Sequence, residues 1–143
     1  MGVEFVEGVP AREQVVALYD SVGWSAYTSA PDALMRALEG SSMVCGAWDG
    51  GELVGLVRVV SDGHTIMYLQ DILIHPEHQR RGLGRALAER VLERYAHVRQ
   101  KVLLTDDRPE QCAFYEALGF SNVAGLEETR LNAYVRIEGA ELS

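Results

Sequence analysis

A loop with two glycines lies between a predicted strand and a predicted helix. Residues 65–74 are mostly β-branched, aromatic or aliphatic and are followed by Pro76, which predicts a buried strand that ends there. Apolar residues then recur at helical spacing over residues 83–95, with charged residues on the opposite side. The order of strand, glycine loop and helix predicts a chain that combines helices with a sheet.

The composition of this loop favours an anion-binding site. The first turn of a helix has backbone N–H groups without intrahelical partners and a partial positive charge, so it attracts phosphate. Gly82 and Gly84 let the backbone approach a ligand closely, and Arg80, Arg81 and Arg85 add positive charge. An ordinary tight turn into a surface helix is the alternative.

Two well-known phosphate loops are excluded by their spacing. A dinucleotide-binding fingerprint would need a third glycine where Leu87 stands, and the P-loop pattern occurs nowhere in the chain. The stretch from Gln79 to Arg85, after an aliphatic-x-Pro strand end, resembles the acetyl-CoA loop of the GNAT superfamily of N-acetyltransferases. A second motif downstream, Phe114 to Phe120, supports the resemblance, which covers most of the chain and is strongest from Val44 to Phe120.

The pattern predicts one domain, residues 1–143, of mixed α/β (α+β) class. A hairpin signal joins two strands, a third follows, and a helical crossover predicts a parallel pair. The resemblance implies a twisted, mostly antiparallel sheet of about six to seven strands, about four flanking helices, and central parallel strands that splay apart. Strands are expected at residues 3–7, 42–48, 52–60, 65–74, 101–105, 120–124 and 133–137.

Charge, cysteine content and histidine spacing limit the ligands and the cellular compartment that we expect. The net charge of −8 argues against nucleic acid and favours cationic or amine ligands. Two cysteines do not form a disulfide framework, which favours a reducing cytoplasm, and no apolar run reaches transmembrane length. His75 and His78 lack a third ligand, so no metal is expected.

The resemblance implies how acetyl-CoA, the co-substrate, would be held. Its pantetheine arm would lie in the gap between the splayed strands and bond the backbone of Ile72, Leu73 and Ile74. Its pyrophosphate would take N–H groups of the loop and charge from the arginines. The residues expected there are Gln79, Arg80, Arg81, Gly82, Leu83, Gly84 and Arg85.

Two residues are candidates for proton transfer. Tyr115 stands where the family places its general acid, and a core aromatic beside Phe114 is the alternative. Asp71 is an acid in an apolar strand, so it is either the general base or a structural hydrogen-bonding group. Relatives also use a water wire as base, which leaves the base unassigned. Arg108 replaces an asparagine common in the family, which puts one cofactor contact in doubt.

The sequence constrains the identity of the acetyl-group acceptor least. A looser resemblance to bacterial and plastid arylalkylamine N-acetyltransferases makes Trp24, Tyr27, Met67 and Tyr68 candidate walls of an acceptor pocket, with plain core packing as the alternative. The primary expectation is direct acetyl transfer to a small-molecule primary amine. A protein or peptide acetyltransferase acting on lysine or the N-terminus, and a non-catalytic acyl-CoA-binding module, remain open. A homodimer is allowed by edge strands.

Overall fold

The computed structural model describes residues 2–142. The chain forms two compact units, one up to Leu104 and one from Thr105 onward, and each is described by itself. A single domain over residues 1–143 therefore stays a prediction. The first unit contains β1 (Glu4–Glu7), α1 (Arg12–Ser21), α2 (Ser25–Thr28), α3 (Pro31–Glu39), β2 (Met43–Asp49), β3 (Glu52–Ser61), β4 (Ile66–Ile74), the 3₁₀ turn η1 (Pro76–His78), α4 (Leu83–Arg94) and β5 (Gln100–Leu103). The second contains α5 (Pro109–Ala117) and the 3₁₀ turn η2 (Val123–Gly125).

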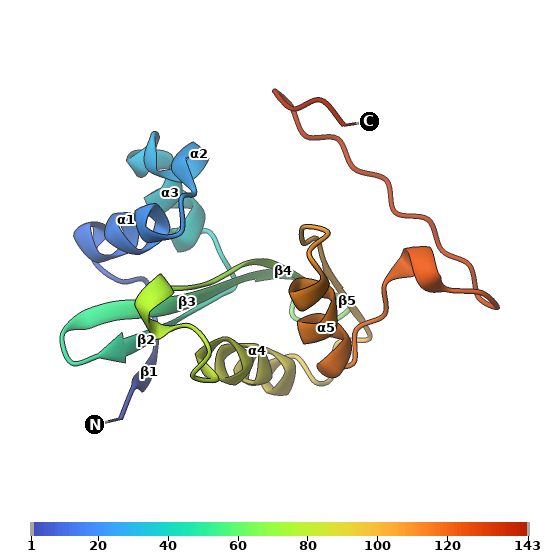
Figure 1. The fold of residues 1–143 in the computed structure, drawn as a ribbon, viewed down its shortest axis with the longest axis horizontal. Coiled ribbons are helices and arrows are strands. Elements are labelled where there is room, and N and C mark those ends of the chain that lie inside the picture. The colour runs from blue at the N-terminus through green and yellow to red at the C-terminus, as the bar shows by residue number, and fades with distance from the viewer. Residues whose placement is uncertain (1, 143) are drawn as a thin grey trace. The chain divides into compact units, whose positions relative to one another are not determined.

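The strands of the first unit form one mixed sheet in the order β1-β2-β3-β4-β5 (Figure 1). Neighbours from β1 to β4 run antiparallel, and β4 and β5 run parallel because α4 crosses between them. This confirms the expected mixed, mostly antiparallel sheet, although five strands replace the expected six to seven among the described residues.

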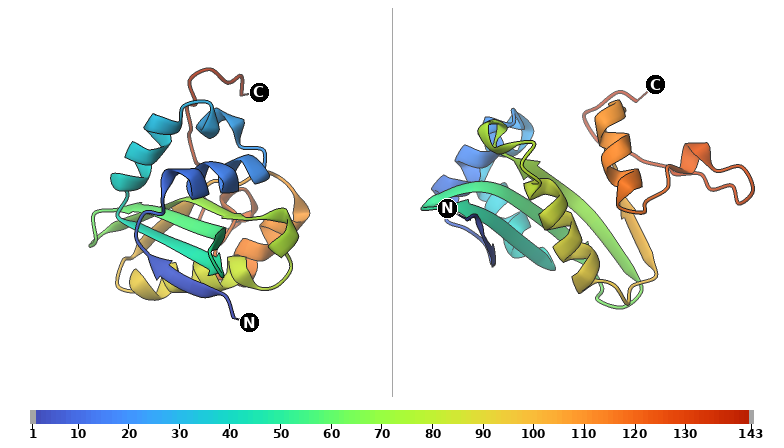
Figure 2. Two further views of the ribbon diagram at one scale, coloured as in Figure 1. Left: turned by 90° about the vertical axis from the view of Figure 1, so that its left-hand side faces the viewer. Right: turned by 60° about the horizontal axis from the view of Figure 1, so that its bottom comes forward.

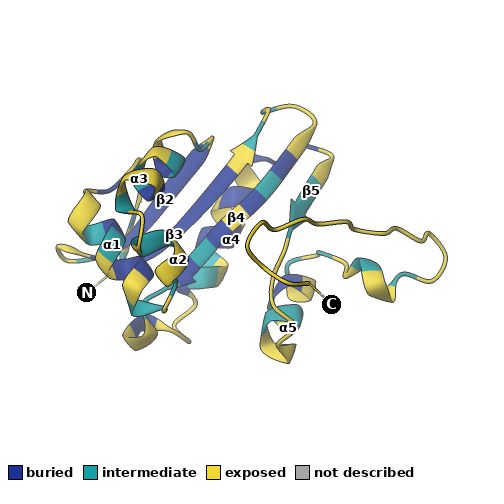
Figure 3. Cartoon of the chain, turned by 90° about the horizontal axis from the view of Figure 1, so that it is seen from above, coloured by how far each residue is buried: buried dark blue, intermediate teal, exposed yellow. Residues whose placement is uncertain are grey.

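Helices cover both faces of this sheet. The helices α1 to α3 pack on one face, where Leu18, Leu34 and Leu56 belong to one buried cluster (Figure 2). The helix α4 packs on the other face, where Leu87 and Val91 belong to a second cluster. Burial is therefore concentrated in β2, β3 and β4, as the dark strands in Figure 3 show. The strands are apolar on both faces because helices cover both.

Two helix ends have a clear local cause. Gly23, which follows α1, has φ +77°, a left-handed conformation that glycine adopts without steric cost. Pro31 is the first residue of α3, where its missing N–H is not needed by the helix. Between them, α2 is a helix of a single turn that follows Trp24 and contains Tyr27.

The second unit corrects two predictions. The strands expected at residues 120–124 and 133–137 are wrong: the first segment runs into η2, and the second has no regular secondary structure. Alternation of side chains is a local property, whereas a strand needs a partner for its backbone groups. Tyr134 is 90% exposed and no ladder includes its segment among residues 105–142.

Gly55 provides a test of the packing between β3 and α4. A Cβ atom at this position would lie 2.8 Å from Ile74 Cδ1, 3.3 Å from Ala47 Cβ and 3.4 Å from Leu87 Cδ1. We predict that Gly55→Val lowers the free energy of unfolding by about 1–3 kcal/mol, because the core has no room for the added atoms. Urea denaturation measures the change.

The control is Gly51→Val, since a Cβ at Gly51 has nothing within 4 Å. Equal unfolding midpoints for the two variants would contradict this packing.

Candidate functional site

Strand β4 has one residue more than β3 at one point of their ladder, and this residue shifts the pairing register. Arg58 of β3 pairs with Asp71, whereas the next residue, Val59, pairs with Leu69. Gln70 therefore has no partner and forms a β-bulge. Since a bulge reverses which face each side chain occupies, Asp71 turns to the face covered by α1 and α2.

Beyond the bulge, one edge of β4 has no strand partner among residues 2–142. The parallel ladder with β5 ends at Leu69 and Leu103. The N–H of His75 donates to Val54 O in β3 at 2.8 Å. Because backbone groups alternate in direction along a strand, the peptide groups of Ile72 and Ile74 point away from β3. We call these peptide groups the open edge of β4.

The open edge fits part of the sequence prediction. The Gln79 side chain donates to Ile74 O at 3.1 Å, on the side away from β3. The peptide groups of Leu73 point toward β3 by the same alternation. Ile72 and Ile74 are thus placed to bond an extended ligand, and Leu73 is placed to bond its neighbouring strand.

The loop after β4 leads directly into the start of α4. Gly82 is the N-cap of this helix with φ +79°, and no side chain of the described residues 2–142 caps its first turn. Arg80 has φ +64°, a conformation that costs a non-glycine residue about 1–3 kcal/mol and that clusters at functional sites. An added Cβ at Gly82 would meet nothing within 4 Å, so the space above the loop is open.

The arginines of the loop differ in their contacts. Arg80 and Arg81 are exposed, and neither appears in an ion pair among residues 2–142. The guanidinium of Arg85 lies 3.5 Å from Glu89 one turn along α4. The free N–H groups and the two exposed guanidinium groups together suit a pyrophosphate.

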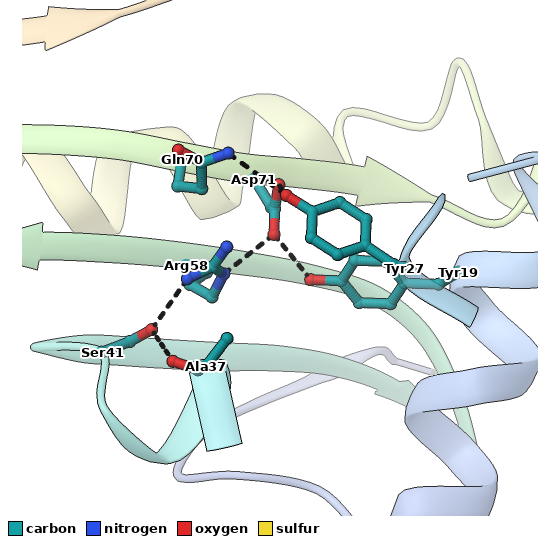
Figure 4. A network of polar contacts seen from close by, with 7 residues as sticks. All are labelled: Tyr19, Tyr27, Ala37, Ser41, Arg58, Gln70 and Asp71. Atoms are coloured by element: carbon teal, nitrogen blue, oxygen red, sulfur yellow. Dashed lines mark hydrogen bonds and ion pairs between the residues drawn. The ribbon is translucent and has the colours of Figure 1, made fainter. Parts of the chain in front are cut away.

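A buried carboxylate lies just beyond the bulge (Figure 4). Asp71 is 3% exposed, and its Oδ2 accepts from Arg58 Nε at 2.8 Å and from the Tyr19 hydroxyl at 3.0 Å. Its Oδ1 accepts from the Tyr27 hydroxyl at 2.9 Å. With Gln70, which donates to Tyr27 at 3.2 Å, these residues form the Asp71 network.

The hydroxyl groups of Tyr19 and Tyr27 keep their protons in this network. Burial and the Asp71 carboxylate raise the pKa of both Tyr19 and Tyr27, so both hydroxyls stay protonated and donate. Burial lowers the pKa of Arg58, but the hydrogen bond and charge of Asp71 outweigh it and raise that pKa overall. The contacts thus support the structural role for Asp71 that the sequence left open beside the base.

The predicted acceptor residues divide between the two faces of the sheet. Trp24 and Tyr27 lie in one aromatic cluster with Tyr19, at ring distances of 5.8 Å for Tyr19–Trp24 and 5.2 Å for Tyr19–Tyr27. Tyr68 is half-buried, and its pKa is raised by burial and by Asp71. Met67 is fully buried in the cluster beneath α4, so the structure does not bring it to the aromatic residues.

The second unit holds the predicted acid. Tyr115 is 7% exposed and packs edge-on against Phe114 and Phe120, at 5.0 and 6.0 Å between ring centroids. Burial, with a smaller contribution from Asp106, raises the pKa of Tyr115 to about 12. Arg108, the departure from the family pattern, is the N-cap residue of α5 and pairs with Asp106.

Arg58 and Tyr19 belong to the network although no motif in the sequence singled them out. Arg58 is a single cation in the apolar strand β3, and Asp71 is a single acid in the apolar strand β4. Because buried charges are almost always paired, these two residues could have been matched from the sequence.

Residues 2–142 contain neither a candidate metal cluster nor a membrane-spanning helix. No group of three or more His, Cys, Asp or Glu side chains that could hold a metal ion occurs there. Within the same residues, no helix combines the length and apolarity needed to cross a membrane.

Curated relatives match parts of the chain. A protein of Gibberella zeae whose name assigns it to the acetyltransferases is 45% identical over 60 residues, which cover 40% of this chain and 34% of that protein. The uncharacterized N-acetyltransferase ycf52 of Pyropia yezoensis is 29% identical over 108 residues, covering 72% of this chain and 60% of the relative. The chain thus spans less than two thirds of the length of either relative.

Solved structures share the fold. The GNAT family acetyltransferase SP0256 of Streptococcus pneumoniae superimposes with a TM-score of 0.77 at 28% identity, over 95% of this chain and 100% of that one. AAC(6')-Iy, solved with the bisubstrate analogue CoA-S-monomethyl-acetylneamine, has a TM-score of 0.70 at 16% identity, over 96% and 99% of the two chains. At that identity the likeness concerns the fold alone.

The profile of the "Acetyltransferase (GNAT) family" matches residues 12–120, more than half of the chain. This range includes the loop, the open edge, the Asp71 network and Tyr115. The chain belongs to the GNAT family of acetyltransferases.

Proposed function

We propose that the protein is an N-acetyltransferase that moves the acetyl group of acetyl-CoA directly to a primary amine of a small molecule. The observation that carries this proposal is the open edge of β4 followed at once by an uncapped helix start. Extended backbone next to free N–H groups suits a ligand with an amide-bearing arm and a pyrophosphate. A neighbour of the same fold was solved with a CoA-containing analogue, which supports the proposal.

Acetyl-CoA supplies an activated acyl group as a thioester. In the proposed mechanism, the N–H of Ile72 donates to the thioester oxygen and stabilises the negative charge that develops on it. The neutral amine attacks the thioester carbon, and a C–N bond forms as the C–S bond breaks. The departing thiolate takes a proton from the hydroxyl of Tyr115, the acid that the family resemblance implies, and Tyr115 regains a proton from solvent. Since Asp71 is fully hydrogen-bonded and paired with Arg58, we assign the amine proton to water rather than to this carboxylate.

The aromatic cluster supports a small-molecule acceptor over a protein. Tyr19, Trp24 and Tyr27 meet edge-on or tilted beside the buried Asp71, and the latter two are half-buried. Their ring faces attract cations and flat apolar groups, which suits an arylalkylamine. We keep the reducing cytoplasm as the proposed location.

A variant at the start of α4 can test whether the pyrophosphate binds there, because its effects on folding and on binding have opposite signs. Gly84→Asp places a carboxylate in the first turn of α4, where it stabilises a helix by about 0.3–1 kcal/mol. The same charge repels a pyrophosphate. We predict an equal or higher melting temperature and a loss of acetyl-CoA affinity of about tenfold or more, measured by calorimetry.

Gly51→Asp, in the turn between β2 and β3, is the control with the same change of charge. If Gly84→Asp binds acetyl-CoA as tightly as this control, the pyrophosphate does not lie at α4.

Tyr115 can be tested as the acid through its pH profile. An alkylamine has a pKa of about 10.4, so kcat/KM should rise with pH toward that value. Because the pKa of Tyr115 is raised to about 12, its hydroxyl keeps its proton over this range and the profile should show no loss of the acid. We predict that Tyr115→Phe lowers kcat by about tenfold or more, measured as release of free CoA thiol.

Tyr134→Phe is the matched control, because Tyr134 is 90% exposed in the same unit. A Tyr115→Phe variant with the kcat of this control would remove Tyr115 from the mechanism.

A further inference from the structure

Each hydrogen bond of the Asp71 network has a fixed donor and a fixed acceptor. A guanidinium has no acceptor, so Arg58 can only donate to Asp71. The carboxylate oxygens of Asp71 accept hydrogen bonds, so the hydroxyl of Tyr27 donates its hydrogen bond to Oδ1. The raised pKa of Tyr27 agrees with a hydroxyl that keeps this proton.

This direction fixes the side-chain amide of Gln70. With its proton committed to Asp71, the oxygen of Tyr27 can only accept from its other neighbour. The Gln70 amide must therefore present Nε2 to Tyr27, at 3.2 Å, which leaves Oε1 turned away (Figure 4). The orientation of an amide is ambiguous by shape alone, and here the network decides it.

Gln70 lies in a place suited to meet a ligand. It is exposed, and it is the bulge residue that immediately precedes the open edge of β4. Among the hydrogen bonds of the described residues, its Oε1 has no partner. The sheet thus presents a carbonyl oxygen whose direction is set by a buried ion pair, two residues from the peptide of Ile72.

The geometry points to Gln70 Oε1, oriented through Tyr27 and Asp71, as the group that recognises the ammonium of the acceptor amine. This inference rests on the proposed function and names how its acceptor is selected. A lone acceptor of fixed direction attracts N–H donors and gives no hydrogen bond to groups that only accept, such as ethers. Gln70 is then a specificity residue, and Tyr27 and Asp71 are positioning residues.

The first experiment uses 2-phenylethylamine and the variant Gln70→Met, which keeps the length of the side chain and removes its carbonyl. A hydrogen bond to a charged group stabilises enough to change affinity about tenfold or more. We expect KM for 2-phenylethylamine to rise about tenfold, kcat to stay within about threefold, and the acetyl-CoA Kd to stay unchanged. Gln100→Met, an exposed glutamine of β5, is the control and should match the parent.

The second experiment tests orientation with Tyr27→Phe. Without the Tyr27 hydroxyl the Gln70 amide can turn its NH₂ outward, toward groups that accept. We expect the preference for 2-phenylethylamine over its neutral analogue methyl 2-phenylethyl ether, measured as a ratio of dissociation constants in the presence of CoA, to fall about tenfold. Circular dichroism and melting temperature confirm that each variant is folded.

An unchanged KM in Gln70→Met, or an unchanged ratio in Tyr27→Phe, overturns the inference. Failure of the parent protein to bind 2-phenylethylamine while it binds acetyl-CoA also overturns it, and leaves the proposed cofactor site intact. Failure to bind acetyl-CoA at all contradicts the proposed function itself.

Discussion

The ion pair between Arg58 and Asp71 is the constraint on which this arrangement depends. Both side chains are buried, and removing one partner of a buried pair typically costs about 3–5 kcal/mol because the other charge remains. The carboxylate also takes hydroxyl hydrogen bonds from Tyr19 of α1 and Tyr27 of α2. One carboxylate therefore joins two adjacent strands to the two helices that carry the aromatic cluster, and its charge orients every donor around it.

The bulge at Gln70 is what makes this carboxylate compatible with an open edge. In a regular strand of this sequence, Asp71 would share the face of Met67 and Leu69, under the apolar side of α4. With the bulge, the acid turns to the face of α1 and α2, and the ladder with β5 ends at Leu69. The bulge residue thus lies where the polar network on one face and the unpaired peptide groups at the edge both begin.

Features encoded by local sequence were the predictable ones. The glycine loop, the start of α4 and the hairpin between β2 and β3 follow from turn chemistry and periodicity, and the structure confirms them. The strand expected at residues 133–137 failed because alternation alone supplies no partner. Met67 and Tyr68 were both expected in the acceptor pocket from the looser family resemblance, although neighbours in a strand face opposite sides of the sheet. Arg58 and Asp71 could be matched from the sequence as single charges in two apolar strands, whereas the bulge that sets their register follows from no local pattern.

The most direct test of this account is amide hydrogen exchange along β4, read by NMR before and after addition of acetyl-CoA. The amides of Ile72 and Ile74 should exchange fast in the free protein and become protected when acetyl-CoA binds. The amides of Asp71 and Leu73, which point toward β3, should be protected in both states and serve as internal controls. Slow exchange at Ile72 and Ile74 in the free protein, or no change on binding, would contradict the account.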